Sequence, residues 1–101
     1  MILPQARIKA DRTHPLYATW NSMFGRAYYK TNPFYKDYGA RGIKVCKAWF
    51  NFITFITDMG SKPTEEHTLD RINVNGNYTP ANTRWSSRVE QANNKRRKYR
   101  C

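Results

Sequence analysis

The segment from His67 to Asn94, HTLDRINVNGNYTPANTRWSSRVEQANN, constrains the fold more than any other part of the chain. Residues 67–72 alternate in a way that predicts a strand, with successive side chains on opposite faces. The Asn-Gly-Asn run at 75–77 tolerates the positive φ that a tight reversal needs, and residues 83–85 can pair back on the first strand. We therefore expect a two-stranded hairpin with an Asn- and Gly-rich loop.

A helix is expected directly after this hairpin. Ser86 and Ser87 are both candidate N-caps, and Glu90, three residues after Ser87, completes a Ser-x-x-Glu capping box. The helix would run from about Arg88 towards Lys95, where the basic run KRRKYR begins. The expected order is thus strand, loop, strand and helix.

Three polar side chains of this segment are candidate metal ligands. Asp70 lies on the first strand, and Gln91 and Asn94, three residues apart, share one face of the expected helix. A divalent cation needs oxygen ligands that converge from two elements. Asp70 with Gln91 or Asn94 could supply them.

At this point the chain resembles a known family. The run YGARGIKVCKAWFNFITFITDMG is followed in fixed order by LDRI, YTPANTRW and EQANN. In these motifs the chain resembles the HNH-type endonuclease-like proteins of phages and bacteria, some of which are homing endonucleases. The similarity covers roughly residues 13–97. It implies a metal-binding Asp, a general-base His, a middle Asn that holds the loop, and a His or Asn on the helix that completes the metal site.

Carried over residue by residue, the resemblance makes Asp70 the metal-binding Asp and Asn82 the middle Asn. Arg71 stands at the general-base position, where a guanidinium that stays protonated cannot take a proton from water. It would instead clamp the scissile phosphate electrostatically. Gln91 stands at the helix position, and its neutral amide is a weaker ligand for a hard cation than a carboxylate. His67 is the remaining candidate for the base.

The resemblance implies a metal-dependent HNH-like DNA endonuclease that hydrolyses phosphodiester bonds with Mg²⁺ or Mn²⁺. Arg71 and Gln91 are also what degeneration of such a site would produce. The alternative is therefore a catalytically degenerate HNH-fold DNA-binding protein, such as a phage-encoded host-directed factor. A third reading is an RNA-binding module, because exposed tyrosines can stack on unpaired bases.

Charge points independently to a polyanionic partner. The 101 residues contain 18 Lys and Arg against 7 Asp and Glu, a formal net charge of +11. A field of that sign and size attracts nucleic acid, most simply duplex DNA, although a basic ribosomal-type protein would have the same composition. The cations expected to contact phosphates are Arg26, Lys30, Arg41, Lys44, Arg84, Arg88, Lys95, Arg96 and Arg97.

The cysteines bear on metal chemistry and on the compartment. Cys46 and Cys101 are the only two, and neither belongs to a Cys-x-x-Cys pair, so no structural zinc is expected. Cys46 stands among apolar residues and is expected to be a buried thiol. With no long apolar run and no sequence typical of a signal peptide, we expect no membrane partner and a cytoplasmic location, that of the host cell if a phage encodes the chain.

The N-terminal half is expected to supply the scaffold. Residues 1–12 are predicted to form a flexible basic arm. A helix is expected from Pro15, at its first helical position, to about Lys30, and its aromatic residues favour a core over base stacking. The run GARGIK at 39–44 is either a phosphate-binding loop or a tight turn.

A second helix is predicted from about Lys47 to Met59, with Gly60 as its C-cap. Its expected apolar face consists of Trp49, Phe52, Ile53, Ile56 and Met59. The complete expectation is an α+β fold with two scaffold helices and an HNH-like hairpin and helix. Residues 13–97 would form a single domain, followed by a basic tail at 98–101.

Overall fold

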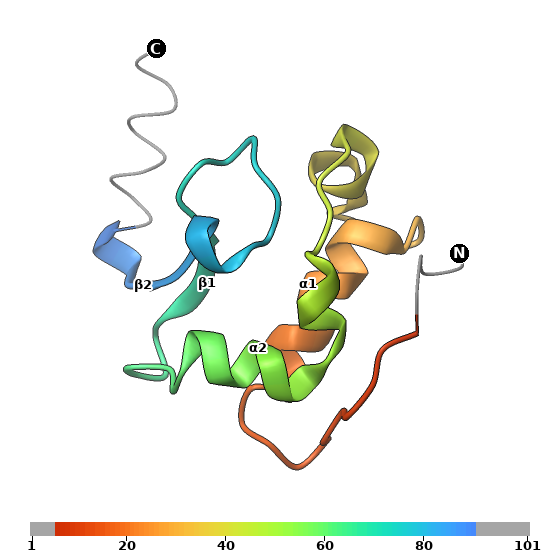
Figure 1. The fold of residues 1–101 in the computed structure, drawn as a ribbon. Helices are drawn as coiled ribbons and strands as arrows, with labels where there is room; N and C mark the ends of the chain where they lie inside the picture. Colours follow the sequence, from red (N-terminus) through yellow and green to blue (C-terminus); the bar gives the residue numbers. More distant parts are fainter. Residues whose placement is uncertain (1–5, 91–101) are drawn as a thin grey trace.

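The computed structural model describes residues 6–90 and is a small mixed helix and strand protein (Figure 1). Its α-helices are α1 (Tyr17–Tyr28) and α2 (Phe52–Met59), and its antiparallel strands are β1 (Thr68–Arg71) and β2 (Thr83–Ser86). Four short 3₁₀ turns complete the order: η1 (Tyr35–Asp37), η2 (Gly39–Arg41), η3 (Lys47–Phe50) and η4 (Pro80–Asn82). The α+β class is confirmed. None of the helices within residues 6–90 has the length and apolar character needed to cross a membrane.

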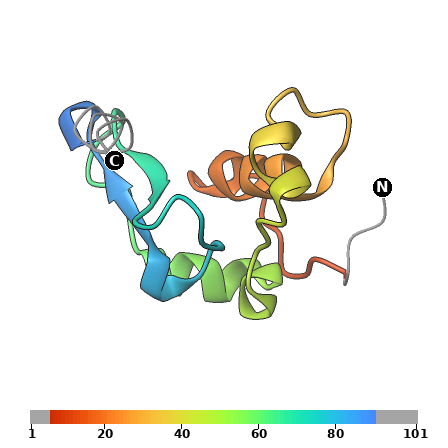
Figure 2. The ribbon, with the colours of Figure 1, turned by 90° about the horizontal axis from the view of Figure 1, so that it is seen from above.

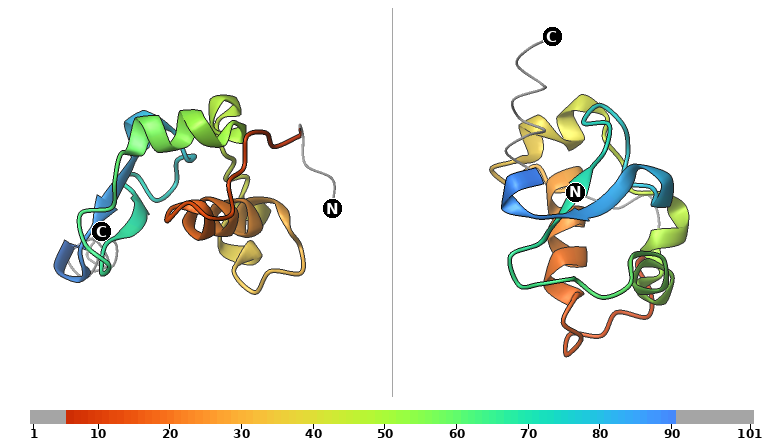
Figure 3. Two further views of the ribbon diagram at one scale, coloured as in Figure 1. Left: turned by 90° about the horizontal axis from the view of Figure 1, so that it is seen from below. Right: turned by 90° about the vertical axis from the view of Figure 1, so that its left-hand side faces the viewer.

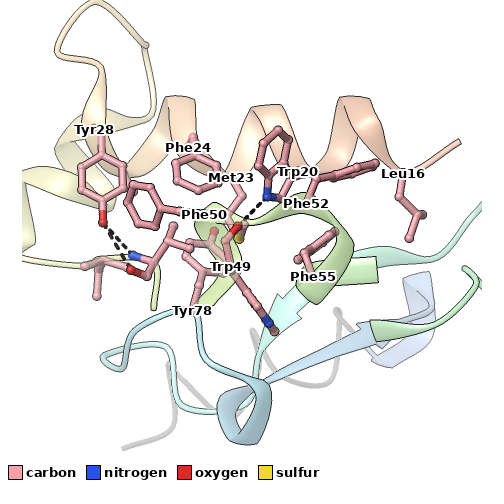
Figure 4. Packing of buried hydrophobic residues seen from close by; sticks show 13 residues of the cluster. Leu16, Trp20, Met23, Phe24, Tyr28, Trp49, Phe50, Phe52, Phe55 and Tyr78 are labelled. Carbon is pink, nitrogen blue, oxygen red and sulfur yellow. Dashed lines mark hydrogen bonds between the residues drawn. The ribbon is translucent and has the colours of Figure 1, made fainter. Parts of the chain in front are cut away.

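The elements are arranged like a letter U. Figure 2 and the left panel of Figure 3 show α1 on one side, the β1–β2 hairpin on the other, and α2 along the base between them. The aromatic core lies between α1 and α2 (Figure 4). Trp20 and Trp49 are fully buried there, and Trp20 Nε1 donates a 2.7 Å hydrogen bond to the Trp49 carbonyl. The expectation that these aromatic residues form the core is confirmed.

Helix α1 begins later than the sequence predicted. Its first residue is Tyr17, so Pro15 precedes the helix instead of occupying its first position. The cause is a turn in which His14 Nδ1 accepts from the Leu16 N–H at 3.0 Å and the His14 carbonyl accepts from the Tyr17 N–H. The helix ends at Tyr28, before Lys30.

The second predicted helix is divided in two. Residues 47–50 form η3, and Asn51 is extended, with its side chain accepting from the Ile53 N–H at 2.9 Å. This N-cap makes Phe52 the first helical residue and sets which face of α2 is buried. Phe52 and Phe55 are fully buried, whereas Ile53 is 50% exposed, so including Ile53 in the apolar face was wrong. Gly60 is the C-cap, as expected, with a φ of 64°.

Two residues of the predicted N-terminal arm, Arg7 and Ile8, contact the domain. Ile8 pairs in parallel with Asn51, and its N–H donates to the Phe50 carbonyl at 2.8 Å. The Arg7 guanidinium lies 4.9 Å from the centre of a Trp20 ring. Residues 7 and 8 therefore belong to the folded unit, because the Ile8 backbone is hydrogen-bonded to Phe50 and the Arg7 guanidinium packs on Trp20.

The burial of Cys46 also differs from what the sequence predicted. The side chain is half-buried at the edge of the core, not fully buried. Partial burial is nevertheless sufficient to raise the pKa of its thiol. The thiol is therefore less reactive as a nucleophile than an exposed one.

Candidate functional site

The two strands of the hairpin form the framework of the candidate site. Thr68 pairs with Ser86, Leu69 with Trp85, Asp70 with Arg84, and Arg71 with Thr83. Because side chains alternate along a strand, the hairpin has two faces. The core-side face carries Leu69, Arg71, Thr83 and Trp85, of which Leu69 and Trp85 pack against the hydrophobic core. The acid-bearing face carries Thr68, Asp70, Arg84 and Ser86.

Asn82 braces the loop between the strands. Its Oδ1 accepts from the Asn73 N–H at 2.8 Å, and its Nδ2 donates to the carbonyls of Asn73 at 3.1 Å and Asn77 at 2.9 Å. A Cβ at Gly76 would lie 2.8 Å from Asn82 Nδ2, which explains the glycine. The amide thus fixes the loop at both ends, the role that the resemblance implies for the middle Asn.

Arg71, expected to clamp a phosphate, points into this loop. The residue is only 8% exposed, and its Nη1 donates to the carbonyls of Val74 at 2.6 Å and Gly76 at 2.9 Å. The guanidinium also lies 4.8 Å from the centre of the Tyr38 ring. Its position therefore organises the loop and joins it to the scaffold.

Asp70 lies on the opposite face, beside the cation of its partner strand. Its Oδ2 is 3.7 Å from Arg84 Nη2, and the two side chains are 21% and 37% exposed, respectively. Arg84 was expected to contact DNA, and in this arrangement it faces a carboxylate. Asp70 is therefore accessible from solvent and held next to a positive charge.

His67 precedes β1 and lies at a groove between α1 and the hairpin. Its Nδ1 is 2.8 Å from Thr64 Oγ1, a contact that orients the ring. Leu69 and Arg26 also line this groove, whereas Asp70 is not among its described lining residues. The geometry thus assigns His67 to the groove and Asp70 to the acid-bearing face.

The helix after β2 begins as predicted. The Ser87 N–H donates to Glu90 Oε1 at 2.9 Å, and the Glu90 N–H donates to Ser87 Oγ at 3.3 Å. These Ser87 bonds, with smaller contributions from the charges of Arg84 and His67, lower the pKa of Glu90. Residues 88–90 are helical. Five predicted site residues lie outside the described part of the chain: Gln91, Asn94, Lys95, Arg96 and Arg97.

The remaining predicted cations lie on different parts of the scaffold. Arg26 donates from Nε and Nη2 to the Tyr78 hydroxyl at 3.3 and 3.2 Å, while Arg41 bonds the Asp37 carbonyl and Asn75 Oδ1. Burial raises the pKa of Tyr78, and the Arg26 charge opposes that shift. Lys30, Lys44 and Arg88 are exposed. Arg26 and Arg41 thus join elements of the fold as well as adding positive charge.

Gly39, the first glycine of the GARGIK run, allows close packing. A Cβ at Gly39 would lie 2.2 Å from the Ala27 carbonyl oxygen, so only glycine allows η2 to approach α1 this closely. Gly42 follows η2 with a φ of 87°, a conformation that glycine adopts without strain. Both glycines are therefore explained by the turn reading, one of the two alternatives from the sequence.

The sequence did not single out Lys62 or the pairing of Tyr38 with Tyr78. Lys62 lines the groove beside Arg26. The Tyr38 and Tyr78 rings are stacked with centroids 6.3 Å apart. No local signal reveals either feature, because each depends on contacts between segments far apart in sequence.

Comparison of the chain with known proteins finds no similar protein. The chain matches no protein-family model, no curated protein and no solved structure. Within residues 6–90, no three His, Cys, Asp or Glu side chains are grouped so that they could hold a metal ion together.

Proposed function

We propose that this chain is a metal-dependent DNA endonuclease of the HNH, or ββα-metal, type. The observation that carries the proposal is the Asn82 brace, which closes the loop directly before β2. A capping box then starts a helix directly after β2. Strand, braced loop, strand and helix start follow in the order that such a nuclease unit requires.

The acid-bearing face is where this proposal places the cation. Asp70 offers a partly exposed carboxylate there, and Ser86 on the same face has a buried hydroxyl with no hydrogen-bond partner among the described residues. Oxygen donors of this kind suit a hard cation such as Mg²⁺ or Mn²⁺. The proposal assigns the remaining ligands to Gln91 or Asn94. A bound cation would stabilise charge on the scissile phosphate and on the leaving oxygen.

Arg84 limits how readily this face takes a cation. Its guanidinium lies 3.7 Å from Asp70 and repels a second positive charge. A phosphate that attracts Arg84 away from Asp70 would remove this repulsion of the metal. Cation and DNA should then bind more tightly together than separately.

Duplex DNA is the proposed substrate because of charge. A net charge of +11 provides strong attraction for polyanions. Arg84, Arg88 and Lys44 are exposed or partly exposed, so they can reach a phosphate backbone without unfolding the protein.

A DNA-binding protein without catalysis is the second candidate. Arg71 favours it, because the residue at the general-base position is buried under the loop and bonds the Val74 and Gly76 carbonyls. Such a chain would keep its fold and its charge without hydrolysing DNA. It could act as a phage-encoded host-directed factor.

The two candidates are separated by a plasmid-nicking assay with Mg²⁺, Mn²⁺ or EDTA, run in parallel with DNA binding. An endonuclease should nick only with metal, and Asp70→Ala should abolish nicking while leaving DNA binding intact or tighter. Asp37→Ala is the matched control, because Asp37 is an exposed carboxylate in η1. Wild-type protein that binds DNA but never nicks it would favour the second candidate.

A further inference from the structure

The groove between α1 and the start of β1 is a second candidate site on this molecule. It has a volume of about 390 Å³ and is lined by residues of α1 and of the segment that leads into β1. Arg26 and Ser22 line it from α1, Lys62 and His67 from the segment that leads into β1. The hairpin contributes Thr68 and Leu69 to the groove, whereas Asp70 is not among its described lining residues.

The groove is positively charged and has no carboxylate among its described lining residues. Arg26 is half-buried, and its hydrogen bonds go to the neutral Tyr78 hydroxyl. A partly desolvated cation with neutral partners attracts an anion more strongly than one in bulk water. Lys62 adds a second charge, and the Thr19 and Ser22 side chains add hydroxyl donors. Cations with hydroxyl donors are the groups that proteins use to hold phosphates.

Arg26 is also fixed in place before any ligand arrives. Its guanidinium bonds the Tyr78 hydroxyl and lies 5.3 Å from the centre of the Tyr38 ring. The Tyr38 ring is in turn stacked on Tyr78 and contacted by Arg71. Both tyrosines are therefore engaged within the protein, which leaves the cations and hydroxyls to recognise a ligand.

The volume of the groove determines whether a single strand or a duplex can enter it. Its volume is near the lower end of small-molecule sites, which span roughly 300–1,000 Å³. This space suits a stretch of one sugar-phosphate strand and is too small for a duplex, whose major groove alone is about 12 Å wide. Tyr38 also lines the groove, but its ring is stacked on Tyr78 and contacted by the Arg26 and Arg71 guanidiniums, so the contact would be mainly with the backbone and tolerant of base sequence.

We propose that this groove binds the backbone of single-stranded DNA. The inference rests on the proposed function and narrows its substrate to DNA in which a single-stranded segment adjoins the duplex. A single strand held in the groove and a duplex on the acid-bearing face would place the hairpin at their junction.

The test is fluorescence anisotropy with a labelled thymidine oligonucleotide, compared with a blunt duplex. Lys62→Glu should weaken binding to the single strand about tenfold or more and reduce the slope of log affinity against log salt by about 0.7, the contribution of one phosphate contact. Lys36→Glu makes the same charge change at an exposed position in η1 outside the described groove lining. It should weaken binding to both DNAs only slightly and equally.

A second variant tests the groove without changing charge. Ser22 is exposed on α1, so Ser22→Trp can fill the groove while the helix stays folded, which circular dichroism would verify. It should reduce affinity for the single strand and spare the blunt duplex. Unchanged single-strand binding by both groove variants would overturn this inference and leave the endonuclease proposal standing. A wild-type protein that binds neither DNA would overturn both.

Discussion

Substitution of Arg71 distinguishes two roles for this residue. The family resemblance implies a catalytic role at this position, whereas the contacts of Arg71 indicate that it holds the loop in place. We expect Arg71→Met to destabilise the fold, since it removes the bonds from Nη1 to the Val74 and Gly76 carbonyls. Arg71→His, which would recreate the Asp-His pair of the family, should do the same. The shorter imidazole cannot span the two carbonyls and pack on Tyr38.

The magnitude follows from the contacts. Hydrogen bonds from a charged group contribute about 1.5–3 kcal/mol each, and a cation–π contact adds about 0.5–2 kcal/mol. Relief of the desolvation cost of the buried guanidinium offsets part of this sum. We expect a net loss of about 3 kcal/mol for Arg71→Met. In a domain of this size it corresponds to a fall in melting temperature of roughly 12–24 °C.

Urea and thermal denaturation, followed by circular dichroism, would measure the loss. The matched control is Arg84→Met, the same substitution at the partly exposed arginine of the neighbouring strand, where an ion pair near the surface contributes about 0–1 kcal/mol. A melting temperature within a few degrees of wild type for Arg71→Met would refute the structural role. A gain of nicking activity in a stably folded Arg71→His would show that the position remains catalytic in character.

Three further outcomes are expected. Asn82→Ala should lose about 2–3 kcal/mol of unfolding free energy in urea denaturation, because three loop bonds disappear, and Asn82→Asp should fall between it and wild type because one acceptor bond survives. Trp49→Ala should cost about 3–5 kcal/mol, and an unchanged melting temperature would contradict its place in the core. Arg84→Ala should tighten Mn²⁺ binding in calorimetry, since it removes the cation beside Asp70; weaker or equal binding would argue against a metal site there.

Local patterns predicted those parts of the fold whose partners are close in sequence. The Ser87–Glu90 capping box spans four residues, and each end can be recognised by its residue type. The pairing of β1 with β2 follows from strand alternation and from the turn residues between them. By contrast, the sequence did not predict where α2 begins or which of its faces is buried. An asparagine such as Asn51 can either continue a helix or cap one. In the structure its side chain accepts a hydrogen bond from the Ile53 N–H and therefore caps α2.

Long-range contacts explain why the role of Arg71 was not predicted. The resemblance put Arg71 at the general-base position, and a cation there was expected to clamp the phosphate. The structure brings Tyr38 of the scaffold against Tyr78 of the loop, and Arg71 and Arg26 both contact these rings. Such a cluster can be recognised only once segments 40 residues apart have been placed together.

The same cluster connects the two proposed sites physically. Tyr78 accepts from Arg26 at the groove, and Arg71 lies 5.4 Å from the centre of its ring while it holds the loop. A phosphate bound in the groove would place negative charge beside Arg26, and Tyr78 lies between this arginine and Arg71. Because Arg71 adjoins Asp70 in β1, occupancy of the groove can alter the hairpin that carries the acid-bearing face. The two proposed sites would then be linked by three side chains, those of Arg26, Tyr78 and Arg71.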